Sequence, residues 1–141
     1  MQFPIIKYYN PSKDKQTFCF YILCKGKHSG RPLNKPIPNC YIIICNDRQQ
    51  QDYFYWLCFG LFHTRVFEND LIGSVIPFLR IGDFKKRLNN AYINTAKHPS
   101  SFNLAVEAMN KHHELSIKLT ELMQQKNAEI QKILRYHILV P

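Results

Sequence analysis

Apolar side chains form short blocks along the first half of the chain, and four of these blocks predict strands. Residues 1–9 begin with an apolar stretch that the turn-forming residues 10–12 close. Residues 17–24 (TFCFYILC) and 40–45 (CYIIIC) are runs of β-branched, aromatic and other apolar side chains, which are typical of buried strands. Residues 71–78 (LIGSVIPF) carry a proline near their end, so we expect a strand that lies at a sheet edge or stops there.

Two segments between these blocks carry helical periodicity. Apolar and aromatic side chains recur at three- and four-residue steps in residues 48–65, and Asn46 or Asp47 is placed to cap that helix. A short basic helix is expected at residues 84–90, with Asp83 as its cap. The two predicted helices would pack on the small sheet.

The longest predicted element follows His98-Pro99-Ser100-Ser101, where proline disfavours helix in the residue before it and serine favours a cap. Residues 102–136 contain no Pro or Gly, so they predict a helix about 50 Å long. Its apolar stripe, which His112 and Lys126 interrupt, is longer than one small domain can cover. We therefore expect it to bind a second helix, in a homodimer or a partner protein. The candidate partner-binding residues are Leu115, Leu119, Leu122, Ile130 and Ile133.

Composition agrees with a globular fold. The chain has 141 residues, 45% of them hydrophobic and 13% aromatic, which suffices for one small core. The elements indicate an α+β fold: a small mixed or antiparallel sheet with packed helices at residues 1–98, followed by one long C-terminal helix at residues 99–137. No apolar run reaches the roughly 18 residues of a membrane span, and no signal-peptide pattern opens the chain. We therefore expect a cytoplasmic protein with no membrane partner.

Five cysteines bear on redox state and metal binding. Their odd number, without a secretion signal, predicts free thiols in a reducing compartment. Cys19/Cys24 and Cys40/Cys45 share a spacing of five, which invites a metal-site interpretation but is wider than the gap in a zinc knuckle. We expect buried thiols that act as small hydrophobic groups, with no bound metal and no cofactor.

The formal net charge of +9 favours an anionic partner. Two segments concentrate basic residues: residues 25–39, whose two glycines and three prolines predict an irregular loop, and residues 80–87. In the first, side-chain cations and the amides beside Gly26 and Gly30 could approach a phosphate, although a solvated loop is the plainer interpretation. The candidate nucleic-acid-binding residues are Lys25, Lys27, His28, Ser29, Arg31, Lys35, Arg80, Lys85, Lys86 and Arg87.

Three segments in sequence order resemble half of a type I restriction–modification specificity subunit. They are residues 52–62 (DYFYWLCFGLF), residues 71–88 (LIGSVIPFLRIGDFKKRL) and the helix from Phe102. The resemblance spans roughly residues 40–135 and implies a target recognition domain followed by a conserved-region helix. A full specificity subunit has two of each, whereas this chain has one. The sequence also resembles an uncharacterised family of small basic bacterial proteins.

Catalysis is poorly supported by the sequence. The ten carboxylates are scattered, no D-x(n)-E-x-K arrangement of a metal-dependent nuclease occurs, and the six histidines form no H-E-x-x-H motif. We therefore expect a non-catalytic protein that binds double-stranded DNA. The alternative is a protein-interaction module that uses the C-terminal helix, and a small nuclease is the disfavoured third interpretation.

Overall fold

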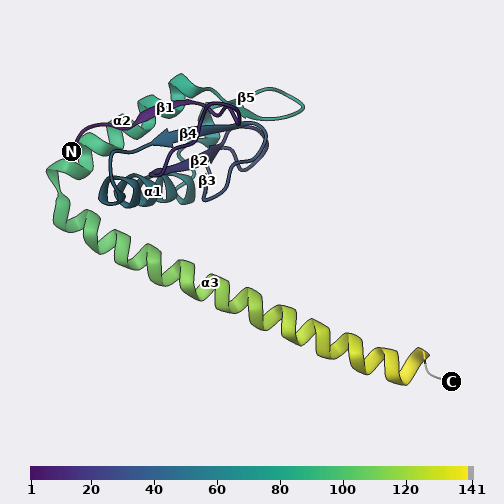
Figure 1. The fold of residues 1–141 in the computed structure, drawn as a ribbon. Coiled ribbons are helices and arrows are strands. Elements are labelled where there is room, and N and C mark those ends of the chain that lie inside the picture. The colour runs from purple at the N-terminus through teal and green to yellow at the C-terminus, as the bar shows by residue number, and fades with distance from the viewer. Residues whose placement is uncertain (140–141) are drawn as a thin grey trace. The chain divides into compact units, whose positions relative to one another are not determined.

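The computed structural model describes residues 1–139 and confirms an α+β fold with small antiparallel sheets and a long C-terminal helix (Figure 1). Residues 1–99 form one compact unit, and the chain from Ser100 onward forms a second. The first unit holds both sheets and the helices α1 (Arg48–His63) and α2 (Ile81–Lys97). The second is the helix α3 (Pro99–Leu134), which continues as a π-helical turn, η2 (Arg135–Leu139).

The main sheet has four antiparallel strands in the order β1-β4-β2-β3. Its centre is formed by the two apolar runs that predicted buried strands, and every residue of β4 except Ile44 is buried. Cys19 pairs with Ile44 and Leu23 with Cys40, so the two central strands align along their full length. The strands are β1 (Ile5–Tyr8), β2 (Cys19–Leu23), β3 (Pro32–Leu33) and β4 (Cys40–Ile44).

The expectation of an irregular loop throughout residues 25–39 is wrong at one point. The short strand β3 pairs with β2 through Tyr21 opposite Leu33 and Ile22 opposite Pro32. Proline lacks an amide donor, and it is tolerated here because β3 is the outermost strand of the sheet. The chain therefore turns back along β2, and the pairing of β2 with β3 holds the two ends of the basic loop between these strands.

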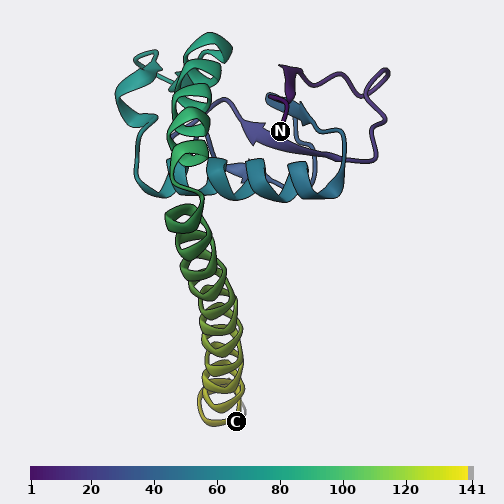
Figure 2. The same cartoon turned by 90° about the vertical axis from the view of Figure 1, so that its left-hand side faces the viewer.

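The helix α1 agrees closely with its prediction. Asp47 is its N-cap, and the Asp47 Oδ1 accepts a hydrogen bond from the Gln50 amide at 2.7 Å. Phe54, Leu57 and Cys58 are buried on the face of α1 that lies against β2 and β3. Figure 2 shows α1 running along the sheet and crossing α2.

The segment after α1 differs from its prediction in two ways. The single strand expected at residues 71–78 is a hairpin of β5 (Leu71–Ile72) and β6 (Phe78–Leu79), preceded by a 3-10 turn, η1 (Glu68–Asp70). Gly73, at φ +98, turns the chain where an added Cβ would lie 2.7 Å from the Ile76 carbonyl oxygen.

The helix α2 is also longer than the predicted 84–90. It begins at Ile81 after Arg80 and ends at Lys97, so Asp83 lies in its first turn rather than at its cap. The predicted basic segment was too short because Phe84 and Leu88, which are both fully buried, continue an apolar face towards Ala91 and Tyr92. That face anchors α2 on the core of the first unit.

An ion pair fastens α2 to the turn before β5. The Arg87 guanidinium donates to both oxygens of Asp70, Nε to Oδ2 at 2.6 Å and a terminal nitrogen to Oδ1 at 2.9 Å. This two-pronged hydrogen bonding lowers the pKa of the Asp70 carboxyl, and the charge of Arg87 adds to the effect. The pair therefore links two elements that are 17 residues apart in the sequence.

The second unit, α3, presents apolar side chains to solvent. It begins at Pro99, the first residue of the predicted C-terminal helix and a residue type favoured at the first helical position. The five candidate partner-binding side chains are between 44% and 63% exposed. None of the helices within residues 1–139 combines the length and apolar character that crossing a membrane requires.

Replacing Gly30 with Ala should destabilise the first unit by about 3 kcal/mol. Gly30 has φ +96, and its added Cβ would lie 2.3 Å from Cδ2 of the buried Phe67 ring. Urea denaturation would measure the loss. Gly26→Ala is the matched control, because Gly26 has the same φ but open space around it, so only backbone strain of about 1 kcal/mol is expected. Equal losses in the two variants would contradict the packing argument.

Replacing Asp70 with Asn should lower the free energy of unfolding at neutral pH by about 1 kcal/mol. A carboxyl with a lowered folded-state pKa stabilises the protein above its unfolded pKa of about 4, and this contribution is lost as the pH falls through the folded pKa. The difference between wild type and Asp70→Asn should therefore shrink from about pH 5 downward.

Denaturation at several pH values would measure this difference. Asp52→Asn serves as the control, because Asp52 forms only an exposed pair with Arg48 and should change stability little. A difference for Asp70→Asn that stays constant from pH 7 to about pH 3 would show that the Asp70 charge does not matter for folding.

Candidate nucleic-acid interface

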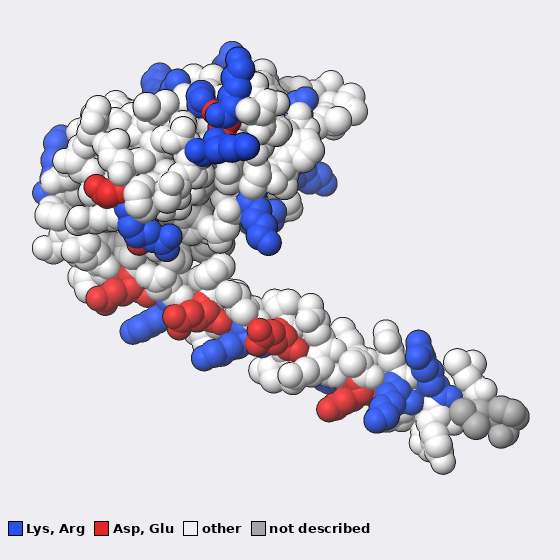
Figure 3. Space-filling model, viewed as in Figure 1, with Lys and Arg blue, Asp and Glu red and all other residues white. Residues whose placement is uncertain are grey.

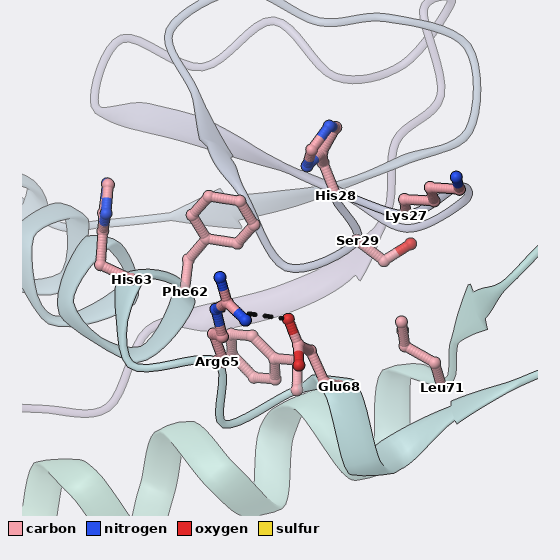
Figure 4. A pocket seen from close by; sticks show the side chains of 9 residues that line it. Lys27, His28, Ser29, Phe62, His63, Arg65, Glu68 and Leu71 are labelled. Carbon is pink, nitrogen blue, oxygen red and sulfur yellow. Dashed lines mark ion pairs between the residues drawn. The ribbon is translucent and has the colours of Figure 1, made fainter.

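A pocket of about 490 Å³ lies in the first unit, between the loop after β2, the end of α1 and the turn η1 (Figure 4). Its apolar part is formed by Phe62, Phe67 and Leu71. Four basic or imidazole side chains and one carboxylate complete the lining together with Ser29. These are Lys27, His28, His63, Arg65 and Glu68.

The loop that carries Lys27 and His28 is held by backbone hydrogen bonds, both within the loop and to neighbouring segments. The Gly26 amide donates to the Pro77 carbonyl and the Gly30 amide to the Leu23 carbonyl, both at 2.7 Å. The amide of Ser29 donates to the Gly26 carbonyl at 3.2 Å. These three amides are therefore already hydrogen-bonded within the protein, which leaves fewer backbone donors at this loop for a phosphate.

Ser29 contributes chiefly to the shape of this loop. Only 3% of its surface is exposed, and its Oγ donates to the Gly26 carbonyl at 2.8 Å. Contact between Ser29 and a base or phosphate would require that hydrogen bond to be given up. Lys27 and His28, by contrast, are exposed at the tip of the loop.

The opposite wall comes from the end of α1 and the turn that follows. Phe62 lies edge-on to the His28 ring, with 6.4 Å between ring centroids, and the His63 ring is tilted by 38° against Phe59, with 4.2 Å between centroids. Arg65 adopts φ +59 and lies 3.7 Å from the Glu68 carboxylate. Figure 4 shows the Arg65 guanidinium directed towards Glu68 below the Phe62 ring.

His63 and Arg65 are absent from the sequence-based candidates. Neither belongs to a run of charge, and the turn after α1 contains no glycine or proline that would mark it. They approach Lys27 and His28 because Gly30 packs against Phe67, a contact between residues 37 positions apart that no local pattern encodes. The positive φ of Arg65 is likewise a backbone feature that the sequence does not mark.

The second basic segment is only partly available to a ligand. Arg80 donates to Asp83 at 2.7 Å, and Arg87 holds Asp70 as described above. Lys85 and Lys86 are exposed and form no ion pair within residues 1–139. Of the consecutive candidates Lys85, Lys86 and Arg87, the two lysines are therefore more available to a ligand than Arg87.

Positive charge is concentrated in the first unit. Residues 1–99 contain 14 Lys and Arg against 6 Asp and Glu, a net charge of +8, whereas residues 100–141 contain 5 against 4, a net charge of +1. Figure 3 shows acidic and basic side chains alternating along α3, while basic side chains predominate on the face of the first unit in view. An anionic partner would therefore be drawn to the first unit.

The cysteines lie apart from this pocket. All five are free thiols; four are buried and Cys19 is partly buried. Burial raises the pKa of the Cys45 thiol to about 12 and raises that of Cys58 as well, which keeps both in the unreactive thiol form. Residues 1–139 contain no group of three or more His, Cys, Asp or Glu placed to hold a metal ion.

Comparison with known proteins places the chain in a family without assigning it an activity. Neither the curated proteins nor the solved structures include a match. A family model matches residues 6–137, which covers most of both units. The chain therefore belongs to the family described as "Family of unknown function (DUF6943)".

Proposed function

We propose that this protein binds double-stranded DNA without catalysis, through side-chain contacts from the first unit to the phosphate backbone. The observation that carries this proposal is the convergence of Lys27 and His28 with His63 and Arg65 on one pocket of a unit whose net charge is +8. Contacts to phosphate supply most of the affinity of proteins that bind DNA without strong sequence preference.

Several cations of the first unit are available for such contacts. They are exposed and form no ion pair within residues 1–139, so binding a phosphate breaks no existing salt bridge. Arg65 pairs with Glu68 at only 3.7 Å and on the surface, so exchange of that partner costs little. The available cations are Lys25, Lys27, Arg31, Lys35, Lys85 and Lys86.

The pocket itself suits binding better than hydrolysis. Its aromatic and aliphatic side chains offer an apolar surface to a sugar or base, and His28 offers ring nitrogens at its rim. A metal-dependent nuclease needs at least two convergent carboxylates, but Glu68 is the single carboxylate among the residues that line this pocket. This composition supports a role in binding.

A basic unit followed by a long helix is also the plan implied by the resemblance to restriction–modification specificity subunits. On that plan the first unit would contact DNA and α3 would dock a partner. A cytoplasmic location, where DNA and a reducing environment are both present, accords with the free thiols.

A second candidate function is protein interaction through α3. Leu115, Leu119 and Leu122 lie on successive turns and are 62–63% exposed, and Ile130 and Ile133 extend the stripe. A helix with so much exposed apolar surface is stabilised when another helix covers it. Self-association through α3 is compatible with DNA binding by the first unit.

Removing positive charge from the pocket should make DNA binding less dependent on salt. Each phosphate contact contributes a slope of about −0.9 in log K against log salt, so about five contacts predict a roughly 500-fold loss of affinity for a fourfold rise in salt. The double variant Lys27→Gln/Arg65→Gln should shallow the slope by about two units and weaken binding to all duplexes alike. Fluorescence anisotropy with labelled duplexes at several salt concentrations would measure both effects.

The control removes the same charge from elsewhere in the first unit. Arg48 and Lys97 lie at the ends of α1 and α2 that are farthest along each helix from His63 and Arg80. Arg48→Gln/Lys97→Gln should leave the slope nearly unchanged. Absence of binding to any duplex at low salt, or equal effects of the two double variants, would contradict a DNA site at this pocket.

A further inference from the structure

Lys126, which interrupts the apolar stripe of α3, is followed one turn later by a second charge, Glu129, at the edge of the stripe. One row of side chains at alternating steps of three and four residues consists of Leu119, Leu122, Lys126, Glu129 and Ile133. All five side chains are exposed, and neither Lys126 nor Glu129 has an ion-pair partner within residues 1–139. Any helix that covers the stripe must therefore supply a partner for each charge.

A parallel pair of α3 helices does not supply these partners. In a parallel pair with matched registers, each stripe residue meets the same residue of the other chain. Lys126 would then lie against Lys126 and Glu129 against Glu129. Two neighbouring layers of like charge would destabilise the centre of the interface.

An antiparallel pair supplies both partners when its two-fold axis passes between Asn127 and Ala128. In that register Lys126 lies level with the partner's Glu129, and symmetry repeats the pair. Leu122 then lies opposite the partner's Ile133, so apolar layers flank the charged centre. The sequence of α3 is thus complementary to itself in one antiparallel register.

Residues that flank these layers fit the same register. Met123 lies near the partner's Ile130, which adds an apolar contact, and Gln125 lies near the partner's Lys132, which avoids contact between two cations. Sliding one helix by seven residues would place Lys126 against the partner's Leu122 and leave that charge unpaired. The pairing of opposite charges therefore favours this register over registers shifted along the helix.

We propose that α3 forms an antiparallel pair with α3 of a second copy of this chain, centred on reciprocal contacts between Lys126 and Glu129. The proposal rests on the self-association suggested above and specifies its orientation and register. It concerns α3 alone, so it does not depend on whether the first unit binds DNA. Lys126 and Glu129 are then the residues that determine the orientation of the partner helix.

Reversing the charge of Lys126 or Glu129, and then of both together, tests this register. The measurements use the whole chain without DNA. Lys126→Glu and Glu129→Lys should each weaken the dimer about tenfold or more, because each converts two attractive contacts into two repulsive ones. The double variant Lys126→Glu/Glu129→Lys exchanges the charges and should return the dissociation constant to within about threefold of wild type. Sedimentation equilibrium would give the dissociation constants, and circular dichroism would confirm the helix content of each variant.

The matched control is Glu114→Lys, which reverses an exposed charge on α3 away from the stripe and should change dimerisation little. In a parallel dimer the single reversals keep like charges facing each other, so they should behave as the control does. Such a result, a double variant as weak as the single ones, or a wild-type protein that stays monomeric at about 200 µM would overturn the proposal. The salt dependence of DNA binding, measured with variants of the first unit, is decided separately.

Discussion

The close approach of Gly30 to the Phe67 ring determines where the basic residues of the first unit lie. Only a residue without Cβ can occupy this position, because the ring is buried and the chain turns at φ +96. Through this contact the loop after β2 meets the turn after α1, and the same turn leads into Asp70 and its partner Arg87. A single steric condition thus joins three segments that are far apart in the sequence.

The two units divide two physical tasks between them. The first unit carries nearly all of the net charge and has a buried apolar core that includes Tyr41, whose hydroxyl donates to the Leu79 carbonyl. The helix α3 is almost neutral and exposes its apolar residues. Net positive charge and the long exposed apolar stripe therefore lie in different parts of the chain.

Elements with strong local patterns could be predicted from the sequence. The runs TFCFYILC and CYIIIC became the central strands, and the periodicity of residues 48–65 with Asp47 as cap became α1. The strand β3 and the division of residues 71–78 into the β5–β6 hairpin were missed because each of these strands is only two residues long, too short for a sequence pattern to mark it. Only part of the candidate site was predicted. Lys27 and His28 lie in a basic loop that the sequence marks, whereas His63 and Arg65 lie near them only because of tertiary packing.

The internal hydrogen bonds of the loop at residues 24–31 have a consequence for how an anion is held. In phosphate-binding loops of the nest type, backbone amides converge on one phosphate and fix its position rigidly. Here the glycine amides donate to protein carbonyls, so an anion at this loop would be contacted by side chains. Under the proposed DNA binding, the long side chains of this loop would suit phosphates repeated along a polymer better than a single small nucleotide.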